Sequence, residues 1–319
     1  MAARARAVGL IGRILQDLQS RNYRTADPRY RENLDRMIEI FDPKAAREID
    51  FRTRLEAAEA LGQAGDPRLA RDNWVRVDGG TFWMGAQKLD PQGRNYDPEA
   101  YDGEAPVHQV ELSPFFVGRY PVTVAEYQRF IAGGGYAKER FWKAGGYGAS
   151  ASPEHWQRQL RYPNRPVVEV SWYEAAAYCA WAEGRLPTES EWECVARGGR
   201  DSARYPWGDD APDVYRANYF EGGPGQPTPV GMYPDGATPQ DVHDLAGNVW
   251  EWTADWFGDY RETGARNPKG PETGDWKSIR GGAWGDYSWV LRLSLRDYYH
   301  ADGRYTNIGF RCVRELLSL

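Results

Sequence analysis

The sequence predicts an α+β protein with short elements and much irregular structure. Glycine and proline are frequent, with 35 Gly and 21 Pro in 319 residues, and this composition favours a loop-rich chain. A few helical segments carry N-cap residues, whereas the last third shows short strand-like runs between Gly, Pro and Asp turns. The hydrophobic fraction of 41% is sufficient for a core of one large domain, or of a large and a small one.

Residues 1–72 predict a helical N-terminal region that packs on the main domain or on a partner. The opening stretch, MAARARAVGLIGRILQDLQSRN, reads as a basic amphipathic helix. Its apolar part is too short and too interrupted by Arg for a secretory signal or a membrane span, so we expect a cytoplasmic protein. Further along, Leu55, Ala58 and Leu61 follow helical spacing, and a Gly-Asp-Pro sequence then ends the helix.

Residues 73–319 predict a larger domain, which begins where NWVRVDGGTFWMGA introduces alternating apolar residues and a glycine pair. Three helices follow, in VTVAEYQRFIAGG, SWYEAAAYCAWAEG and TESEWECVARGG. Thr123, Ser171 and Thr188 are their expected N-caps, and in the last two a glutamate three residues later completes a capping box.

Charge and cysteine content exclude several functional classes. The net charge of −6 does not indicate a nucleic-acid-binding protein. The three cysteines form no CxxC motif and no even disulfide framework, so they are interpreted as small buried hydrophobes. Glu189, Glu191 and Glu193 are interpreted as capping and salt-bridge residues rather than as a catalytic carboxylate pair.

Eight short segments follow one another along the larger domain, and their sequences and order resemble those of a known family. They are GGTFWMG (79–85), EAPVHQVELSPFFVGRYPVTVAEYQRF (104–130), PVVEVSWYEAAAYCAWAEGRLPTESEWECVARGG (166–199), YPWGDD (205–210), PVGMYPDG (229–236), DVHDLAGNVWEWTADWF (241–257), RGGAW (280–284) and NIGFRCVRE (307–315).

Together they resemble the formylglycine-generating enzyme, or sulfatase-modifying-factor, domain over residues 75–318. That resemblance implies a C-type-lectin-like fold with little regular secondary structure. The family includes copper-dependent oxidases that make formylglycine, iron-dependent sulfoxide synthases that act on hercynine, and non-enzymatic binding modules. The last group includes the variable proteins of diversity-generating retroelements, and fold alone does not choose among these functions.

The residues needed for either family chemistry are missing. The oxidase resemblance places a pair of copper(I)-binding Cys near Asp286 and Leu291, and neither position is Cys. The synthase needs an iron site rich in His, but the N-terminal region has no His and the four His of the chain are scattered. We therefore predict that the chain is not an enzyme and requires no cofactor.

The family resemblance also implies a structural calcium site in HDLAGNVWEW. Its ligands would be the side chains of Asp244 and Glu251 and the main-chain carbonyls of Gly247 and Val249. Oxygen ligands on a tight glycine-containing loop suit calcium. The alternative is that the two carboxylates bind main-chain amides.

The segment between RGGAW and IGFR has the residue alphabet of a variable region. Retroelement variable proteins diversify adenines of AAC codons, which cannot yield Lys, Glu, Gln, Met or Trp. Residues 285–307 contain no Lys, Glu, Gln or Met and only one Trp, at 289. Tyr and Trp supply contact area at low rotamer cost, and Ser, Gly and Asp supply adaptable polar contacts, as in antibody paratopes.

We therefore predict a non-enzymatic ligand-binding protein with a diversified surface in 285–307, held by the framework residues Arg280, Trp284, Arg292, Arg296, Phe310 and Arg311. The expected ligand is a protein, with no nucleic acid and no membrane span involved. Two alternatives are an interaction module of the same family without diversification, and aromatic residues that merely fill the core. The candidate ligand-binding residues are Asp286, Tyr287, Trp289, Leu291, Leu293, Leu295, Asp297, Tyr298, Tyr299, His300, Tyr305, Thr306 and Asn307.

Overall fold

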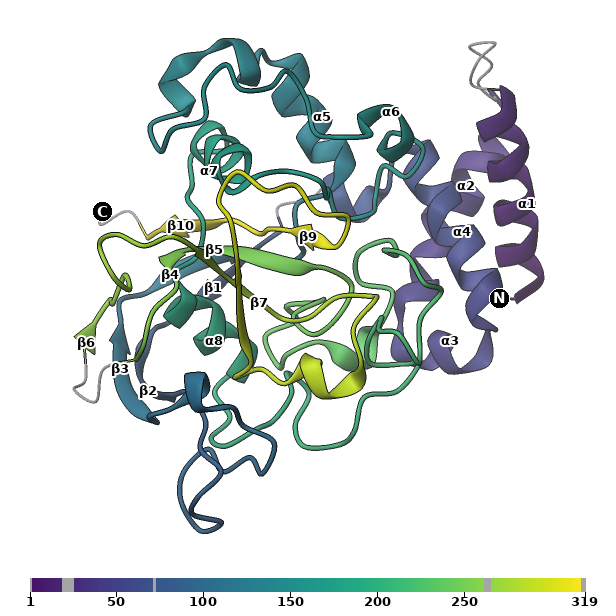
Figure 1. The fold of residues 1–319 in the computed structure, drawn as a ribbon. Helices are drawn as coiled ribbons and strands as arrows, with labels where there is room; N and C mark the ends of the chain where they lie inside the picture. The colour runs from purple at the N-terminus through teal and green to yellow at the C-terminus, as the bar shows by residue number, and fades with distance from the viewer. Residues whose placement is uncertain (1, 19–25, 71–72, 261–264, 317–319) are drawn as a thin grey trace.

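A computed structural model describes residues 2–18, 26–70, 73–260 and 265–316 (Figure 1). Helices dominate the first part of the described chain, and short strands, helices and long loops make up the rest, as the α+β prediction requires. None of the described helices is both long and apolar enough to cross a bilayer. The N-terminal helices are α1 (Ala2–Leu18), α2 (Pro28–Arg36), α3 (Pro43–Glu48) and α4 (Phe51–Ala64).

The N-terminal helices are capped by aspartates and pack closely. The aspartate before each of α2, α3 and α4 accepts a backbone N–H from the first turn of that helix. α1 lies so close to α4 that a Cβ atom added to Gly12 would be 2.2 Å from the Cβ of Ala60. The predicted core residues Ala58 and Leu61 are fully buried in this contact region.

This helical region packs on the larger domain. Arg54 is buried in α4 and donates a hydrogen bond to the carbonyl oxygen of Met232 at 2.5 Å. Arg68 likewise donates to the carbonyl oxygen of Val230 at 2.8 Å. The side chains of Met232 and Tyr233 complete the apolar cluster of the helices, so one core spans both regions.

The described strands form three small sheets. In the first, β4 lies between β1 and β10 and is antiparallel to both; in the second, β3 pairs antiparallel with β2 and parallel with β6. The third has the order β8-β7-β5-β9. The predicted domain boundary at residue 72 lies outside the described residues, just before β1. The strands are β1 (Trp74–Val77), β2 (Gly80–Met84), β3 (His108–Leu112), β4 (Phe115–Gly118), β5 (Trp250–Trp256), β6 (Ala265–Arg266), β7 (Lys277–Arg280), β8 (Arg296–Tyr299), β9 (Ile308–Gly309) and β10 (Val313–Glu315).

The three predicted capped helices of the larger domain are present. Thr123, Ser171 and Thr188 each accept the backbone N–H of the third helical residue, and the glutamate there returns a contact to the cap backbone. A short additional helix precedes the second of them. These helices are α5 (Val124–Ala132), α6 (Trp156–Gln159), α7 (Trp172–Trp181) and α8 (Glu189–Arg197).

The third sheet positions the candidate site. β5 is its central strand and buries Trp250 and Trp252 in the largest apolar cluster of the domain, together with Ile279 and Phe310. The last stretch of the chain, yellow in Figure 1, leaves β7, forms the short 3-10 helix η8 (Ser288–Leu291) and returns as β8 and β9. The candidate segment 285–307 therefore begins shortly after β7 and ends just before β9, and both of these strands pair with β5.

Candidate functional site

Five of the six predicted framework residues of the C-terminal segment have buried side chains, whereas Trp284 is only partly buried. Arg280, Arg292 and Arg311 are almost fully buried, and so is Phe310. The side chain of Arg296 is only 3% exposed. Because a buried guanidinium is costly without a carboxylate partner, the positions of these arginines are fixed by their partners.

Two of the arginines share one glutamate of α8. Arg280 Nη1 donates to Glu189 Oε1 at 2.8 Å, and Arg296 binds both carboxylate oxygens of Glu189 at 2.6 and 2.8 Å. Arg280 also donates to Glu193 at 2.7 Å. Burial alone would raise the pKa of Glu189, but the two guanidinium groups outweigh burial and lower that pKa to about 2. The predicted salt-bridge role of this helix is confirmed.

A third arginine ties the middle of the segment to a distant loop. Arg292 is bidentate to Glu104, at 2.8 and 2.9 Å, and donates to Asp97 at 3.0 Å. Ser294 donates to the same Glu104 carboxylate at 2.6 Å. These buried contacts hold the backbone between η8 and β8 in place, as expected for framework residues.

The candidate ligand-binding residues separate into three classes by exposure. Three leucines are buried; a second group is partly buried, and a third is open to solvent. The exposed group is Tyr287, Trp289, Tyr298, His300 and Thr306, and the partly buried group is Asp286, Asp297, Tyr299, Tyr305 and Asn307.

The structure corrects the placement of the three leucines. Leu291, Leu293 and Leu295 are 0%, 1% and 6% exposed and belong to three different apolar clusters. The backbone between η8 and β8 crosses the interior, so leucines and framework arginines are buried together. The residue alphabet admits leucine, but these side chains are not at the ligand-accessible surface.

The exposed aromatic residues of the segment form two groups with aromatic residues from elsewhere in the chain. In the first group, Tyr287 contacts Phe220 with ring centroids 5.1 Å apart, and Trp289 contacts Tyr101 at 6.1 Å. Tyr287, Phe220 and Tyr101 are each more than half exposed. These two pairs are called the η8 aromatic group below.

The second group lies on β8. Tyr298 is 42% exposed and contacts Phe257 at 4.5 Å and Trp276 at 5.3 Å, while His300 stacks on Trp276 at 3.7 Å. These four residues are called the β8 aromatic group. The contributions of Tyr101, Phe220, Phe257 and Trp276 were not predicted, because no local pattern shows which distant aromatic residues meet the segment.

The positions where the oxidase family has its Cys pair cannot hold copper through thiolates in this chain. Asp286 is partly buried and accepts a hydrogen bond from the Ala283 amide at 2.9 Å, while Leu291 is fully buried. Two other cysteines do meet, because the Sγ atoms of Cys179 and Cys312 lie 2.7 Å apart in the core. The contact was not predicted, but Cys179 and Cys312 are buried as expected, whereas Cys194 is only partly buried. Burial, followed by its contact with the other thiol, raises the pKa of Cys179, so it stays protonated.

The two carboxylates predicted to bind calcium already have hydrogen-bond partners in the protein. Both carboxylate oxygens of Glu251 accept hydrogen bonds, from Arg311 at 2.6 Å and from Trp192 at 2.8 Å. Asp244 accepts the Gly231 amide at 2.7 Å. Among the residues that the structure describes, no cluster of three or more His, Cys, Asp or Glu could hold a metal. The calcium site therefore stays a prediction.

Calcium removal tests this point directly. Because Arg311 already neutralises Glu251, we expect the melting temperature to be the same in excess EGTA and in millimolar calcium. Differential scanning calorimetry measures this, with magnesium as the control for ionic strength. A melting temperature that rises with calcium but not with magnesium would restore the predicted site.

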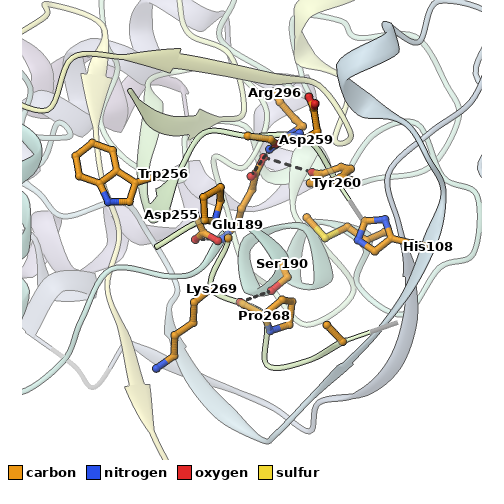
Figure 2. Close-up of a pocket in the computed structure, with 15 residues that line it drawn as sticks. His108, Glu189, Ser190, Asp255, Trp256, Asp259, Tyr260, Pro268, Lys269 and Arg296 are labelled. Atoms are coloured by element: carbon orange, nitrogen blue, oxygen red, sulfur yellow. Dashed lines mark hydrogen bonds and ion pairs between the residues drawn. The ribbon is translucent and has the colours of Figure 1, made fainter. Parts of the chain in front are cut away.

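A cavity of about 370 Å³ adjoins the buried carboxylates (Figure 2). Figure 2 shows Glu189 bonded to Arg296 and Tyr260 at one end of the pocket, and Ser190 bonded to the carbonyl of Pro268 below. The Asp255 carboxyl also lines the pocket. We call this cavity the Glu189 pocket; the sequence did not predict it, because its wall combines β3, α8, β5, β8 and the 265–271 loop.

Asp255 is the unusual titratable group of the Glu189 pocket. Its carboxyl accepts the Glu189 backbone amide at 2.8 Å and is only 4% exposed. Burial, and then the negative charge of Glu189, raise the pKa of Asp255 to about 7. A carboxyl with this pKa can give or accept a proton near neutral pH.

The raised pKa predicts a pH-dependent penalty. Between pH 4 and 7 the Asp255 carboxyl ionises in the unfolded chain but stays protonated in the folded one, so it lowers stability increasingly as pH rises. Asp255→Asn removes this penalty. We expect the free energy of unfolding of the variant, relative to that of the wild type, to increase as the pH rises through this range. Urea denaturation measures this difference. The exposed Asp78→Asn is the control, and parallel curves for all three proteins would contradict the assignment.

Comparison with known proteins identifies relatives over most of the chain. The sequence model of the sulfatase-modifying factor enzyme 1-like domain matches residues 62–316. A formylglycine-generating enzyme of Streptomyces coelicolor is 35% identical over 306 residues, covering 81% of this chain and 94% of the relative. A hercynine oxygenase of Mycolicibacterium thermoresistibile is 38% identical over 243 residues, 67% of this chain and 54% of the relative. The chain thus spans about half of that second relative's length.

Solved structures agree on the fold. PvdO from Pseudomonas aeruginosa has a TM-score of 0.58 at 25% identity, over 76% of this chain and 94% of PvdO. Treponema denticola variable protein 1 has a TM-score of 0.56 at 21% identity, over 76% of this chain and 95% of that protein, which is a likeness of fold alone. The predicted α+β fold of the formylglycine-generating-enzyme, C-type-lectin-like type is confirmed.

These relatives overturn one conclusion drawn from the sequence. The chain was expected not to be an enzyme, but relatives of 33–38% identity over two thirds or more of it are named as enzymes. The physical error was to treat a missing Cys pair as a missing function. The absence of copper-binding thiolates removes one chemical route, and it does not exclude other chemistry on the same scaffold.

Proposed function

Because the chain belongs to the sulfatase-modifying factor enzyme 1-like domain family, we propose that it uses this scaffold to recognise a ligand through the η8 and β8 aromatic groups. The observation that carries the proposal is the gathering of exposed Tyr, Trp and Phe side chains from distant parts of the chain around segment 285–307. Aromatic side chains of this kind dominate the binding energy of protein interfaces.

The chemistry of the two groups favours a protein ligand. Tyr287, Trp289 and Tyr298 are large, have few rotatable bonds and carry a polar atom at one end, so they lose little entropy on binding. They project from a backbone held by Arg292 and Arg296, which limits the cost of ordering the loops. The partly buried Asp286 and Asp297 add acceptors beside them.

We further propose that the exposed positions other than Trp289 are diversified by a retroelement. The support is the residue alphabet of 285–307 together with the division between exposed and buried positions. The test is the DNA beside the coding sequence. It should contain a near-copy of codons 284–311 that differs at adenines, next to a reverse transcriptase gene. A flanking region without such a copy would reject diversification and leave the ligand-binding proposal standing.

Ligand binding is tested by selection against the protein itself. Peptides from a displayed library are selected on the wild type and then measured on Tyr287→Ala/Tyr298→Ala. We expect at least a tenfold loss of affinity in this variant, about 1.4 kcal/mol. Tyr147→Ala, an equally exposed tyrosine outside both groups, is the matched control. Peptides that bind all three proteins alike would contradict the proposal.

A second candidate function is catalysis in the Glu189 pocket. The observation that favours it is the Asp255 carboxyl, which titrates near neutral pH at the wall of a cavity of about 370 Å³. The names of the relatives, hercynine oxygenase and formylglycine-generating enzyme, supply the assays: oxygen-dependent conversion of hercynine, and formation of formylglycine in a sulfatase peptide. This candidate requires turnover that Asp255→Asn abolishes without unfolding the protein. Turnover that is unchanged in Asp255→Asn would exclude this pocket.

A further inference from the structure

A second cavity, of about 380 Å³, lies between the α6 turn and the 225–227 loop. Three arginines, Arg158, Arg161 and Arg165, line it together with one carboxylate, that of Glu169. The lining is therefore net positive in a chain whose net charge is −6. We call it the arginine cavity; its position and lining are independent of the Glu189 pocket.

The single carboxylate of the arginine cavity is already engaged. Glu169 Oε1 lies 2.8 Å from Nδ1 of His155, and its Oε2 accepts from Gln159 at 3.4 Å. Neither contact uses a cavity arginine. Glu169 is therefore held by His155 and Gln159.

Arg165 is held in position by other groups. One of its nitrogens, Nη2, pairs with Glu59 of α4, and its guanidinium stacks over the Tyr162 ring at 3.7 Å. Its side chain is 8% exposed, and its Nε has no hydrogen-bond partner among the residues that the structure describes. The Nε1 of Trp284, on the same cavity wall, also has no acceptor within the described part of the chain. Buried donors are normally satisfied, so both point to an acceptor-bearing ligand.

One part of the wall is apolar. Val124, Val168 and Pro227 line the cavity beside the indole of Trp284, whereas Gln159 and Gln226 add polar side chains. A cavity of this size, with convergent polar groups beside an apolar patch, suits a small molecule rather than a polypeptide. Guanidinium groups bind carboxylate and phosphate oxygens in preference to other groups.

We propose that the arginine cavity binds a small organic anion. Its carboxylate or phosphate group accepts from Arg165 Nε and Trp284 Nε1, with the guanidinium of Arg158 beside it. Its apolar body lies against Val124 and Val168. Thr306, the last exposed position of the candidate surface, also lines this cavity. A ligand bound in the cavity would therefore contact the end of segment 285–307. The proposal does not depend on the function of that segment.

The test uses isothermal titration calorimetry with defined probes. Indole-3-acetate and phenyl phosphate carry the two anionic groups on an aromatic body, inorganic phosphate lacks the body, and indole-3-acetamide lacks the charge. We expect saturable binding of at least one aromatic anion, weakened tenfold or more in Arg158→Gln/Arg161→Gln. Both arginines are exposed, so this variant should keep the wild-type melting temperature. Arg52→Gln/Arg140→Gln, at exposed arginines elsewhere, is the matched control.

Each result decides the proposal. Preference for indole-3-acetate assigns a carboxylate ligand and preference for phenyl phosphate assigns a phosphate ligand, provided that the double variant loses it and the control does not. The proposal is overturned if indole-3-acetamide binds as well as the acetate or if inorganic phosphate binds as well as phenyl phosphate. It is also overturned if no probe saturates below about 10 mM, which corresponds to less than 3 kcal/mol of binding free energy.

Discussion

Replacing Glu189 by glutamine is expected to lower the free energy of unfolding by about 3–5 kcal/mol. The variant keeps the shape of the side chain but leaves the guanidinium groups of Arg280 and Arg296 without the carboxylate they share. Both arginines are buried, so water cannot replace the lost charge. Urea denaturation followed by tryptophan fluorescence measures the loss.

The pH dependence and a matched control make this prediction specific. The pKa of Glu189 is about 2 in the folded protein, below its ordinary value, so its contribution is complete above about pH 4.5 and is lost as pH falls toward 2. The difference between wild type and variant should therefore shrink in that range. Glu32→Gln removes an exposed ion pair with Arg36 and should cost less than about 0.5 kcal/mol. Equal losses in the two variants would show that Glu189 is not a buried ion-pair centre.

Replacing Leu293 by asparagine is expected to lower the free energy of unfolding by about 3–5 kcal/mol, whereas Tyr298→Asn should lower it by only about 1 kcal/mol through lost aromatic contacts. Both residues lie in the candidate variable segment, and asparagine belongs to its residue alphabet. Leu293 is 1% exposed and packs in the core, while Tyr298 is 42% exposed. Thermal and urea unfolding of the two variants give the comparison.

The same pair of variants decides where diversification can occur. If the proposed retroelement acts on this gene, natural copies should vary at Tyr287, Tyr298 and His300 but keep apolar residues at Leu291 and Leu293. Trp289 should stay constant, because substituted adenines in an AAC codon do not give Trp. A stable Leu293→Asn protein would mean that the segment repacks freely, and the separation of framework from surface would fail.

The fold was predictable where its determinants are local. Thr123, Ser171 and Thr188 predict where their helices begin, because capping contacts are short-range. Each of them is an N-cap in the structure. The leucines at 291, 293 and 295 were misplaced for the converse reason. Leu291 ends the short helix η8, and Leu293 and Leu295 lie in neither helix nor strand. Buried Leu therefore alternates with buried Arg and Ser, and no period separates inside from outside.

The site was predictable only in part, because its remaining members come from distant segments. Trp276 and Phe220 join Tyr298 and Tyr287 through tertiary contacts that no local pattern contains. The Glu189 pocket and the raised pKa of Asp255 likewise depend on which distant segments of the chain meet there. The sequence was sufficient to identify segment 285–307, but the residues that contact it could be identified only from the folded structure.

The contact of Arg292 with Glu104 also constrains the order of folding. The two residues are separated by 188 positions in the chain, and the carboxylate becomes buried only when the arginine arrives. Closing such a long loop is slow compared with forming local helices. During synthesis, the backbone that presents Tyr287 and Trp289 can therefore become ordered only after nearly the whole domain has left the ribosome. Display of the aromatic surface would then report that the entire chain has folded correctly.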